Sequence, residues 1–177
     1  TSSDLVLDLV YVVLLAKLGG DFRTNLDSSM FVAVRDFLAL FIPIYNLWSV
    51  HNIFLNRFET SDVLFTFFFI ASIMLVAFVG ISATSCGDAS EREACNQFAW
   101  CFAGARSLLV LANMYAWYHN TKYRLNIIVY IIPDVLVVIC WIITGFMPYE
   151  LHDNYTTAQY WSFILMWWLG IAIDLVR

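Results

Sequence analysis

The chain has 177 residues, of which 62% are hydrophobic and 13% are charged, and its formal net charge is −5. Soluble domains carry about 25% charged residues, so this composition excludes an ordinary soluble domain. The net negative charge also argues against a nucleic-acid partner, because proteins that bind nucleic acids present basic surfaces.

The hydrophobic residues group into six segments, and each of them is predicted to form a transmembrane helix. A helix needs about 20 residues to cross a bilayer. The predicted spans are residues 3–18, 29–52, 62–83, 96–118, 125–147 and 157–176. Their long apolar runs do not alternate with polar residues as the strands of a barrel do. The predicted fold is therefore all-α, a polytopic transmembrane bundle of about six spans, in a single domain over residues 1–177.

Local signals predict how the spans begin, bend and end. Gly19-Gly20-Asp21 is predicted to end the short first span. Pro43 is a predicted kink in the second span, and Ser61-Asp62 is a predicted cap of the third. Aromatic residues near the span ends are typical of membrane interfaces; they are Trp48, Trp100, Trp117, Tyr118, Tyr149, Tyr155, Tyr160 and Trp161. Because the chain begins at Thr1 rather than Met and stops directly after an apolar run, we expect a piece of a longer multispan protein.

Basic residues in the connections predict the orientation. Arg57 follows the second span, and Lys122 and Arg124 lie between the fourth and fifth. The connections on the opposite side contain most of the acidic residues. The positive-inside rule then places the amino end and the basic connections in the cytoplasm.

Two features of the connections predicted to lie outside agree with that orientation. Cys86 and Cys95 share the connection between the third and fourth spans and are a candidate disulfide. Asn154 opens an Asn-Tyr-Thr sequon and is a candidate glycosylation site. The alternatives are two free cysteines and a sequon that arises by chance.

Charged residues inside the spans are the candidate functional residues. Asp4 and Asp8 are one helical turn apart, on one face of the first span. Arg106 lies near the middle of the fourth span, where a charge costs about 2.5–3.5 kcal/mol. We therefore expect Arg106 to pair with a carboxylate, and Asp8 and Asp134 are the candidates. These four residues predict a polar cavity or an ion path, and the alternative is a buried ion pair that only fixes helix packing. The packing interpretation is favoured for Arg35, Asp36 and Asp174, which lie near the interfaces.

No catalytic or metal site is predicted. His51, His119 and His152 are scattered over different connections, without cysteines or histidines at ligand spacing nearby. The sequence contains no phosphate-binding glycine loop, no nucleophile elbow and no serine or cysteine with a base close in the sequence. We expect no enzyme activity and no cofactor.

Several segments resemble the bacterial low-temperature-requirement A family of multispan membrane proteins. Asp4-Leu5-Val6-Leu7-Asp8-Leu9-Val10-Tyr11 is similar to the family's opening Glu-Leu-Phe-Phe-Asp-Leu-Val-Phe/Tyr, with Asp4 in place of Glu and Val6-Leu7 in place of the Phe pair. Residues 56–62 resemble its Asn-Arg-Phe-Asp-x-Asp run. Further matches are Trp48, Arg106 with Leu108-Leu109, Trp141 and residues 168–175. The resemblance covers nearly the whole chain, but only about the first half of a typical member. It implies a fold and a location rather than a reaction.

The leading functional hypothesis is transport or ion permeation, with Asp4, Asp8, Arg106 and Asp134 in a polar interior. The alternative is a non-catalytic membrane scaffold or stress-adaptation protein whose charges only hold helices together, and a lipid-modifying enzyme ranks last. The expected location is the plasma membrane or a bacterial inner membrane. The expected partners are the lipid bilayer and the rest of the protein's own chain. The sequence leaves the ion or substrate and the oligomeric state open.

Overall fold

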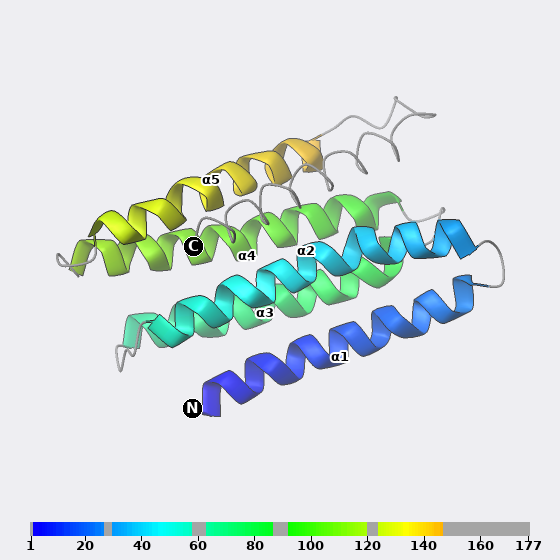
Figure 1. The fold of residues 1–177 in the computed structure, drawn as a ribbon, viewed down its shortest axis with the longest axis horizontal. Coiled ribbons are helices and arrows are strands. Elements are labelled where there is room, and N and C mark those ends of the chain that lie inside the picture. Colours follow the sequence, from blue (N-terminus) through cyan, green and yellow to red (C-terminus); the bar gives the residue numbers. More distant parts are fainter. Residues whose placement is uncertain (1, 27–29, 58–62, 87–91, 120–123, 147–177) are drawn as a thin grey trace.

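Five long helices make up the part of the chain that the structure, a computed structural model, describes: residues 2–26, 30–57, 63–86, 92–119 and 124–146. The helices are α1 (Ser2–Asn25), α2 (Met30–Arg57), α3 (Val63–Cys86), α4 (Arg92–His119) and α5 (Arg124–Phe146). Successive helices run in opposite directions (Figure 1). These residues contain no strand, so the all-α prediction is confirmed for them. The predicted sixth span, the Ser61-Asp62 cap and Asn154 lie outside the described residues.

The predicted end of the first helix is wrong. The α1 helix continues through Gly19-Gly20-Asp21 and ends at Asn25. A glycine inside a helix costs about 1 kcal/mol relative to alanine, which is a weak local preference. Leu18 is buried on one side of the glycines, and beyond them Phe22 packs on Phe37 of α2 with ring centroids 5.0 Å apart. Tertiary packing on both sides of the glycine pair therefore keeps this segment helical.

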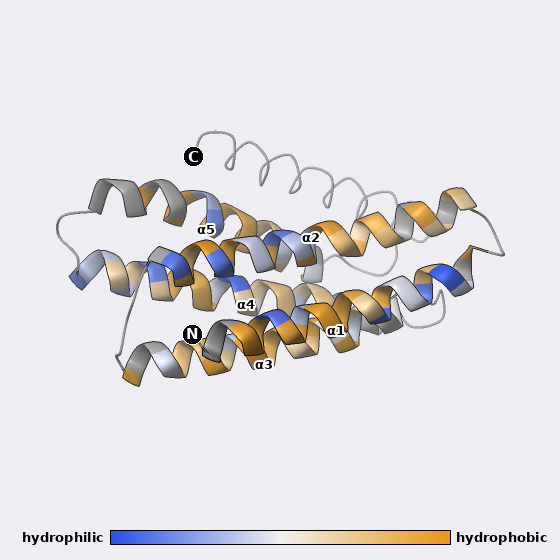
Figure 2. Ribbon diagram, turned by 60° about the horizontal axis from the view of Figure 1, so that its bottom comes forward, coloured by the Kyte–Doolittle hydropathy of each residue, from blue (hydrophilic) through white to orange (hydrophobic). Residues whose placement is uncertain are grey.

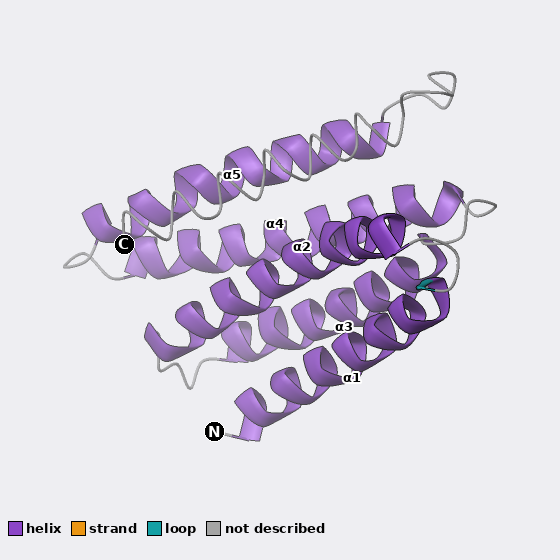
Figure 3. Cartoon of the chain, turned by 45° about the vertical axis from the view of Figure 1, so that its right-hand side comes forward, coloured by secondary structure: helices purple, strands orange, loops and turns teal. Residues whose placement is uncertain are grey.

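The helices form an antiparallel bundle with α1 and α5 at opposite edges (Figures 1 and 3). The α4 helix packs extensively against both α3 and α5, while α1 packs against α2 and α3. The α2 helix also reaches α4. Consequently α4 lies between α3 and α5, and α2 lies against α1 and reaches α4.

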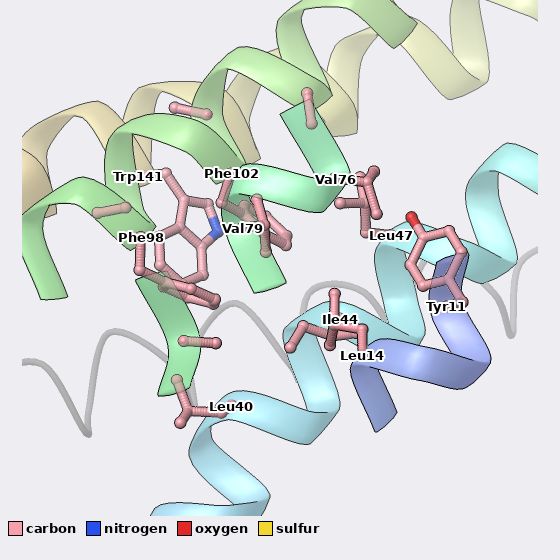
Figure 4. Packing of buried hydrophobic residues seen from close by; sticks show 14 of the residues in the cluster. Tyr11, Leu14, Leu40, Ile44, Leu47, Val76, Val79, Phe98, Phe102 and Trp141 are labelled. Carbon is pink, nitrogen blue, oxygen red and sulfur yellow. The ribbon is translucent and has the colours of Figure 1, made fainter. Parts of the chain in front are cut away.

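The apolar core runs through the interior of this bundle. Trp141 of α5 is 1% exposed and packs edge-to-face against Phe98 and at a tilt against Phe102 of α4, with ring centroids 5.6 and 4.4 Å apart. Figure 4 shows these rings together with Leu47 of α2 and Tyr11 of α1, which belong to the same cluster of buried side chains. The core is thus continuous from one edge of the bundle to the other.

Many large hydrophobic side chains lie on the outer surface of the helices. Large apolar side chains are exposed along one stripe of α3, at Phe67, Ile70, Met74, Phe78 and Ile81. The opposite stripe of α3 is buried and contains Ser72. Figure 2 shows hydrophobic residues along all five helices, interrupted by hydrophilic ones at a few positions. A surface of this kind is suited to lipid rather than to water.

Two of the helices contain a segment long and apolar enough to cross a membrane, residues Phe37–Asn56 of α2 and Thr66–Ala83 of α3. In α5 the corresponding apolar segment is shorter, Ile131–Ile143. Charged and amide residues along α1 and α4 lower the hydropathy of those helices. The all-α bundle therefore agrees with the prediction, whereas a count of about six spans is not confirmed.

Candidate functional site

A buried ion pair links α4 to α5. The Arg106 Nη1 donates to Asp134 Oδ1 at 2.9 Å, and the two side chains are 2% and 8% exposed. The guanidinium carbon lies 5.8 Å from the centre of the Phe102 ring, so Arg106 also makes a cation–π contact. Of the two carboxylates that we expected as partners of Arg106, Asp134 makes the contact. The pair offsets the cost of placing a charge in the interior of the bundle.

A second polar contact links α1 to α2. Trp48 Nε1 donates to Asp8 Oδ1 at 2.9 Å, at a half-buried position. Trp48 is predicted near the end of the second span; in the structure it lies well inside α2, and its indole faces α1. An indole nitrogen can only donate, so it matches a carboxylate acceptor.

A third polar contact links α2 to α3. His51 is 3% exposed; its Nδ1 lies 2.8 Å from the Leu47 carbonyl oxygen, and its Nε2 is hydrogen-bonded to the Ser72 hydroxyl. A carbonyl oxygen only accepts, so Nδ1 bears the hydrogen, and Nε2 of the neutral ring accepts from Ser72. The prediction that His51 lies in a connection is wrong, because the residue belongs to the buried face of α2.

Tyr11 of α1 brings a further polar group into the interior. Its side chain is 2% exposed, and within the described part of the chain its hydroxyl has no hydrogen-bond partner. In Figure 4 the hydroxyl points toward Leu47 and Val76 rather than away from the bundle. The Arg106 guanidinium acts electrostatically on both Tyr11 and His51. Arg106 thus links Tyr11 of α1 and the His51–Ser72 contact to the ion pair between α4 and α5.

All five helices contribute to this environment at a similar depth. At about 1.5 Å of rise per residue, the residues lie about 9 to 20 Å along their helices from the end of the bundle where α2 ends and α3 begins. We call this end the α2–α3 end; it is on the left in Figure 1. We call the set of residues the polar layer; its members are Asp8, Tyr11, Trp48, His51, Ser72, Arg106 and Asp134.

The polar layer is positioned by the same helical periodicity that builds the core. In α5, Asp134 shares a buried stripe with Val137 and Trp141. In α2, His51 lies on the stripe of Leu47 and Phe54. Residues three, four and seven apart lie on one face of a helix, so burying the apolar members of a stripe also buries the polar one.

The remaining predicted site residues are only partly described. Asp4 belongs to α1, but its side chain is outside the described residues. Cys95, in the first turn of α4, is disulfide-bonded, while Cys101 and Cys140 form no disulfide. The side chain of Cys86 is also outside the described residues, so its pairing with Cys95 stays a prediction.

Sequence reasoning missed three members of the polar layer: Trp48, His51 and Ser72. A signal was present in the spacing, since Tyr11 lies three residues after Asp8 and His51 lies three residues after Trp48. That spacing places each pair on one helix face. Ser72 gives no such signal, because serine is common at helix-packing faces in membranes.

The comparison with known proteins identifies the family. Residues 1–177 match the family model described as bacterial low temperature requirement A protein. The chain belongs to this family. The family prediction is thereby confirmed, and membership indicates a membrane protein. No curated protein and no solved structure gives a significant match to the chain.

Proposed function

We propose that this member of the low-temperature-requirement A family is a polytopic transport or ion-permeation protein, and that the polar layer is the place where the ion or substrate binds. The observation that carries the proposal is the polar layer itself, to which each of the five described helices contributes a polar side chain at a similar depth. Ionisable residues inside membrane segments most often belong to substrate or ion pathways. Helical bundles also build their ligand and metal sites from side chains on facing helices, and the polar layer consists of such side chains.

The polytopic arrangement, with up to six spans including residues 157–176, belongs to the same proposal. It is supported by five antiparallel helices of at least 23 residues each, and by their exposed apolar surfaces. A helix of this length reaches across the hydrocarbon core of a bilayer. We propose a plasma membrane or a bacterial inner membrane as the location, lipid as the surrounding partner, and no enzyme activity.

A scaffold or stress-adaptation role is the second candidate, and one observation favours it. The Arg106–Asp134, Trp48–Asp8 and His51–Ser72 contacts each join two different helices. Hydrogen bonds between helices stabilise membrane bundles without any transport. A scaffold therefore needs no feature of the polar layer beyond these links.

Asp8→Asn separates the two functions, because it removes a charge and keeps the side-chain shape. The full-length protein is placed in liposomes, and K⁺, Na⁺, Cl⁻ and H⁺ movements are measured with ion-sensitive dyes against protein-free liposomes. For a transporter we expect flux in the wild type and an altered rate or pH profile in Asp8→Asn, with the protein still inserted. Asp21→Asn is the matched control, since Asp21 lies on the same helix beyond the glycine pair and outside the polar layer.

One result would contradict transport, namely the absence of flux for every ion with the wild type. An Asp8→Asn protein that is less stable but shows the wild-type flux and pH response would place the ion path away from Asp8, as expected of a residue that only holds α1 on α2.

A further inference from the structure

A small cavity lies directly beside His51 and Ser72. Its volume is about 20 Å³, and its lining includes Phe54, Phe68 and Ala112. About 10–15 Å³ is sufficient for one water molecule when polar partners are present. The two polar side chains of the lining, His51 and Ser72, are already hydrogen-bonded to each other. The cavity therefore has room for one water next to this pair.

The cavity extends from the polar layer toward the α2–α3 end. Phe54 follows His51 by about one turn of α2, and Phe68 precedes Ser72 by about one turn of α3, at about 3.6 residues per turn. Ala112 lies beyond Arg106 toward the same end of α4. This end contains the basic connections and is the one predicted to face the cytoplasm. The cavity thus lies on the side of the polar layer that faces the α2–α3 end.

We propose that His51 and Ser72 bind and pass on a proton, so that the ion handled at the polar layer is H⁺; this inference rests on the proposed function. Nδ1 keeps its hydrogen on the Leu47 carbonyl. Once the Ser72 hydrogen has turned away from Nε2, a hydronium ion in the cavity transfers its proton to the freed Nε2 lone pair and leaves as water. Ser72, a hydroxyl with one hydrogen and two lone pairs, turns from donor to acceptor. Loss of the same proton to a water restores the neutral ring and the original hydrogen bond.

Each neighbouring helix presents an identifiable group to this site. Ser72 faces His51 from α3, and Arg106 of α4 acts on it electrostatically. Arg106 is paired with Asp134 of α5. From α1, Tyr11 shares the electrostatic environment of Arg106, and Asp8 is bonded to Trp48, which precedes His51 by three residues. The positive charge of Arg106 opposes a proton on His51, and the carboxylate of Asp134 offsets part of that charge.

The size and lining of the cavity favour a proton over a metal ion. No three histidine, cysteine, aspartate or glutamate side chains gather around a common point in the described part of the chain. A cation such as Na⁺ needs several oxygen ligands or its own waters, and a cavity for about one water cannot supply them. A proton needs only one lone pair and one neighbouring water.

Proton flux in liposomes tests the inference. The full-length protein is placed in vesicles of phosphatidylcholine and phosphatidylglycerol with an internal pH-sensitive dye, and K⁺, Na⁺ and Cl⁻ movements are measured in parallel. We expect H⁺ movement in the wild type and a loss of about a hundredfold in His51→Gln, the typical contribution of a positioned proton-transfer group. His119→Gln is the matched control, because His119 is exposed at the end of α4. Its H⁺ flux should equal that of the wild type.

Variants of Ser72 distinguish a loss of proton transfer from a loss of folding. Ser72→Ala removes the hydroxyl and should reduce H⁺ flux, whereas Ser72→Thr retains it and should restore the flux. Nitrogen NMR of labelled histidine should show the Nδ1-protonated neutral ring of His51 in the wild type, and protonation of Nε2 as the external pH is lowered.

The outcomes distinguish the inference from the proposed function. Normal H⁺ flux in inserted His51→Gln overturns the proton relay, and so does a wild type that moves K⁺, Na⁺ or Cl⁻ but not H⁺; transport stands in both cases. A His51 ring whose NMR signals stay unchanged over the pH range in which H⁺ flux changes also overturns it. A wild type that moves no ion overturns the proposed function, and the relay with it.

Discussion

Arg106 shows most clearly how a single residue can shape the interior of this bundle. It contacts Asp134 by a 2.9 Å hydrogen bond, lies over the Phe102 ring and acts electrostatically on Tyr11 and His51. A buried pair gains Coulomb energy but loses hydration, so its net effect on stability is small when intact. The loss of one partner is different, because the other charge is then left in an apolar region.

Substitutions at Arg106 and Asp134 should therefore be strongly non-additive. We expect Arg106→Leu alone to lower the free energy of unfolding by about 3–5 kcal/mol, because it leaves a buried carboxylate without its partner. The double variant Arg106→Leu/Asp134→Leu should be more stable than Arg106→Leu. The free energy of unfolding of each variant is measured on the purified protein in detergent. If the free energy of unfolding lost in the double variant equals the sum of the losses in Arg106→Leu and Asp134→Leu, the pair is not energetically coupled.

At the scale of the helices, two glycines lie where neighbouring helices touch, and they leave different amounts of room for a side chain. A Cβ atom added at Gly80 of α3 would meet Leu14 Cδ1 of α1 at 2.9 Å and Cγ at 3.0 Å. One added at Gly104 of α4 would meet Leu75 no closer than 3.5 Å, which is ordinary contact. The α1–α3 contact therefore depends on the missing side chain of Gly80, whereas the α3–α4 contact has room at Gly104.

Alanine at these two glycines should consequently have opposite effects. Alanine is favoured over glycine in a helix by about 1 kcal/mol. We expect Gly104→Ala to leave the thermal unfolding temperature unchanged or raise it, and Gly80→Ala to lower it as Leu14 is displaced. Thermal unfolding of both variants under identical detergent conditions is the measurement. An equal rise in both would show that Leu14 moves away at no cost and that the α1–α3 distance is not limited by Gly80.

At the scale of the whole molecule, the alternation of helix direction places successive connections at opposite ends. The end of α3 and the start of α4 therefore lie at the opposite end of the bundle from the end of α4 and the start of α5 (Figure 1). Cys95 is disulfide-bonded at the start of α4, and disulfides are rare in a reducing cytoplasm. Both considerations favour an external position for the start of α4.

Thiol labelling should verify this orientation. In a Cys101→Ala/Cys140→Ala protein only Cys86 and Cys95 remain, and we expect a membrane-impermeant maleimide to label them on intact cells only after reduction. As a control, Lys122→Cys in a protein whose four natural cysteines are replaced should be labelled only after the membrane is permeabilised. The reverse pattern, with Cys86 and Cys95 accessible only after permeabilisation, would invert the orientation and place the cavity beside His51 toward the outside.

The sequence by itself determined the class, the family and the need of Arg106 for a partner. These depend on composition, apolar run length and local motifs, each of which is contained in consecutive residues. Tertiary structure alone decided that the partner is Asp134, that Trp48 binds Asp8, and that His51 meets Ser72, because each contact joins two different helices. It also extended α1 through Gly19-Gly20, since the packing of Leu18 and Phe22 outweighs a preference of about 1 kcal/mol per glycine. A sequence shows which face a residue occupies, but only the packing of the helices determines what that face meets.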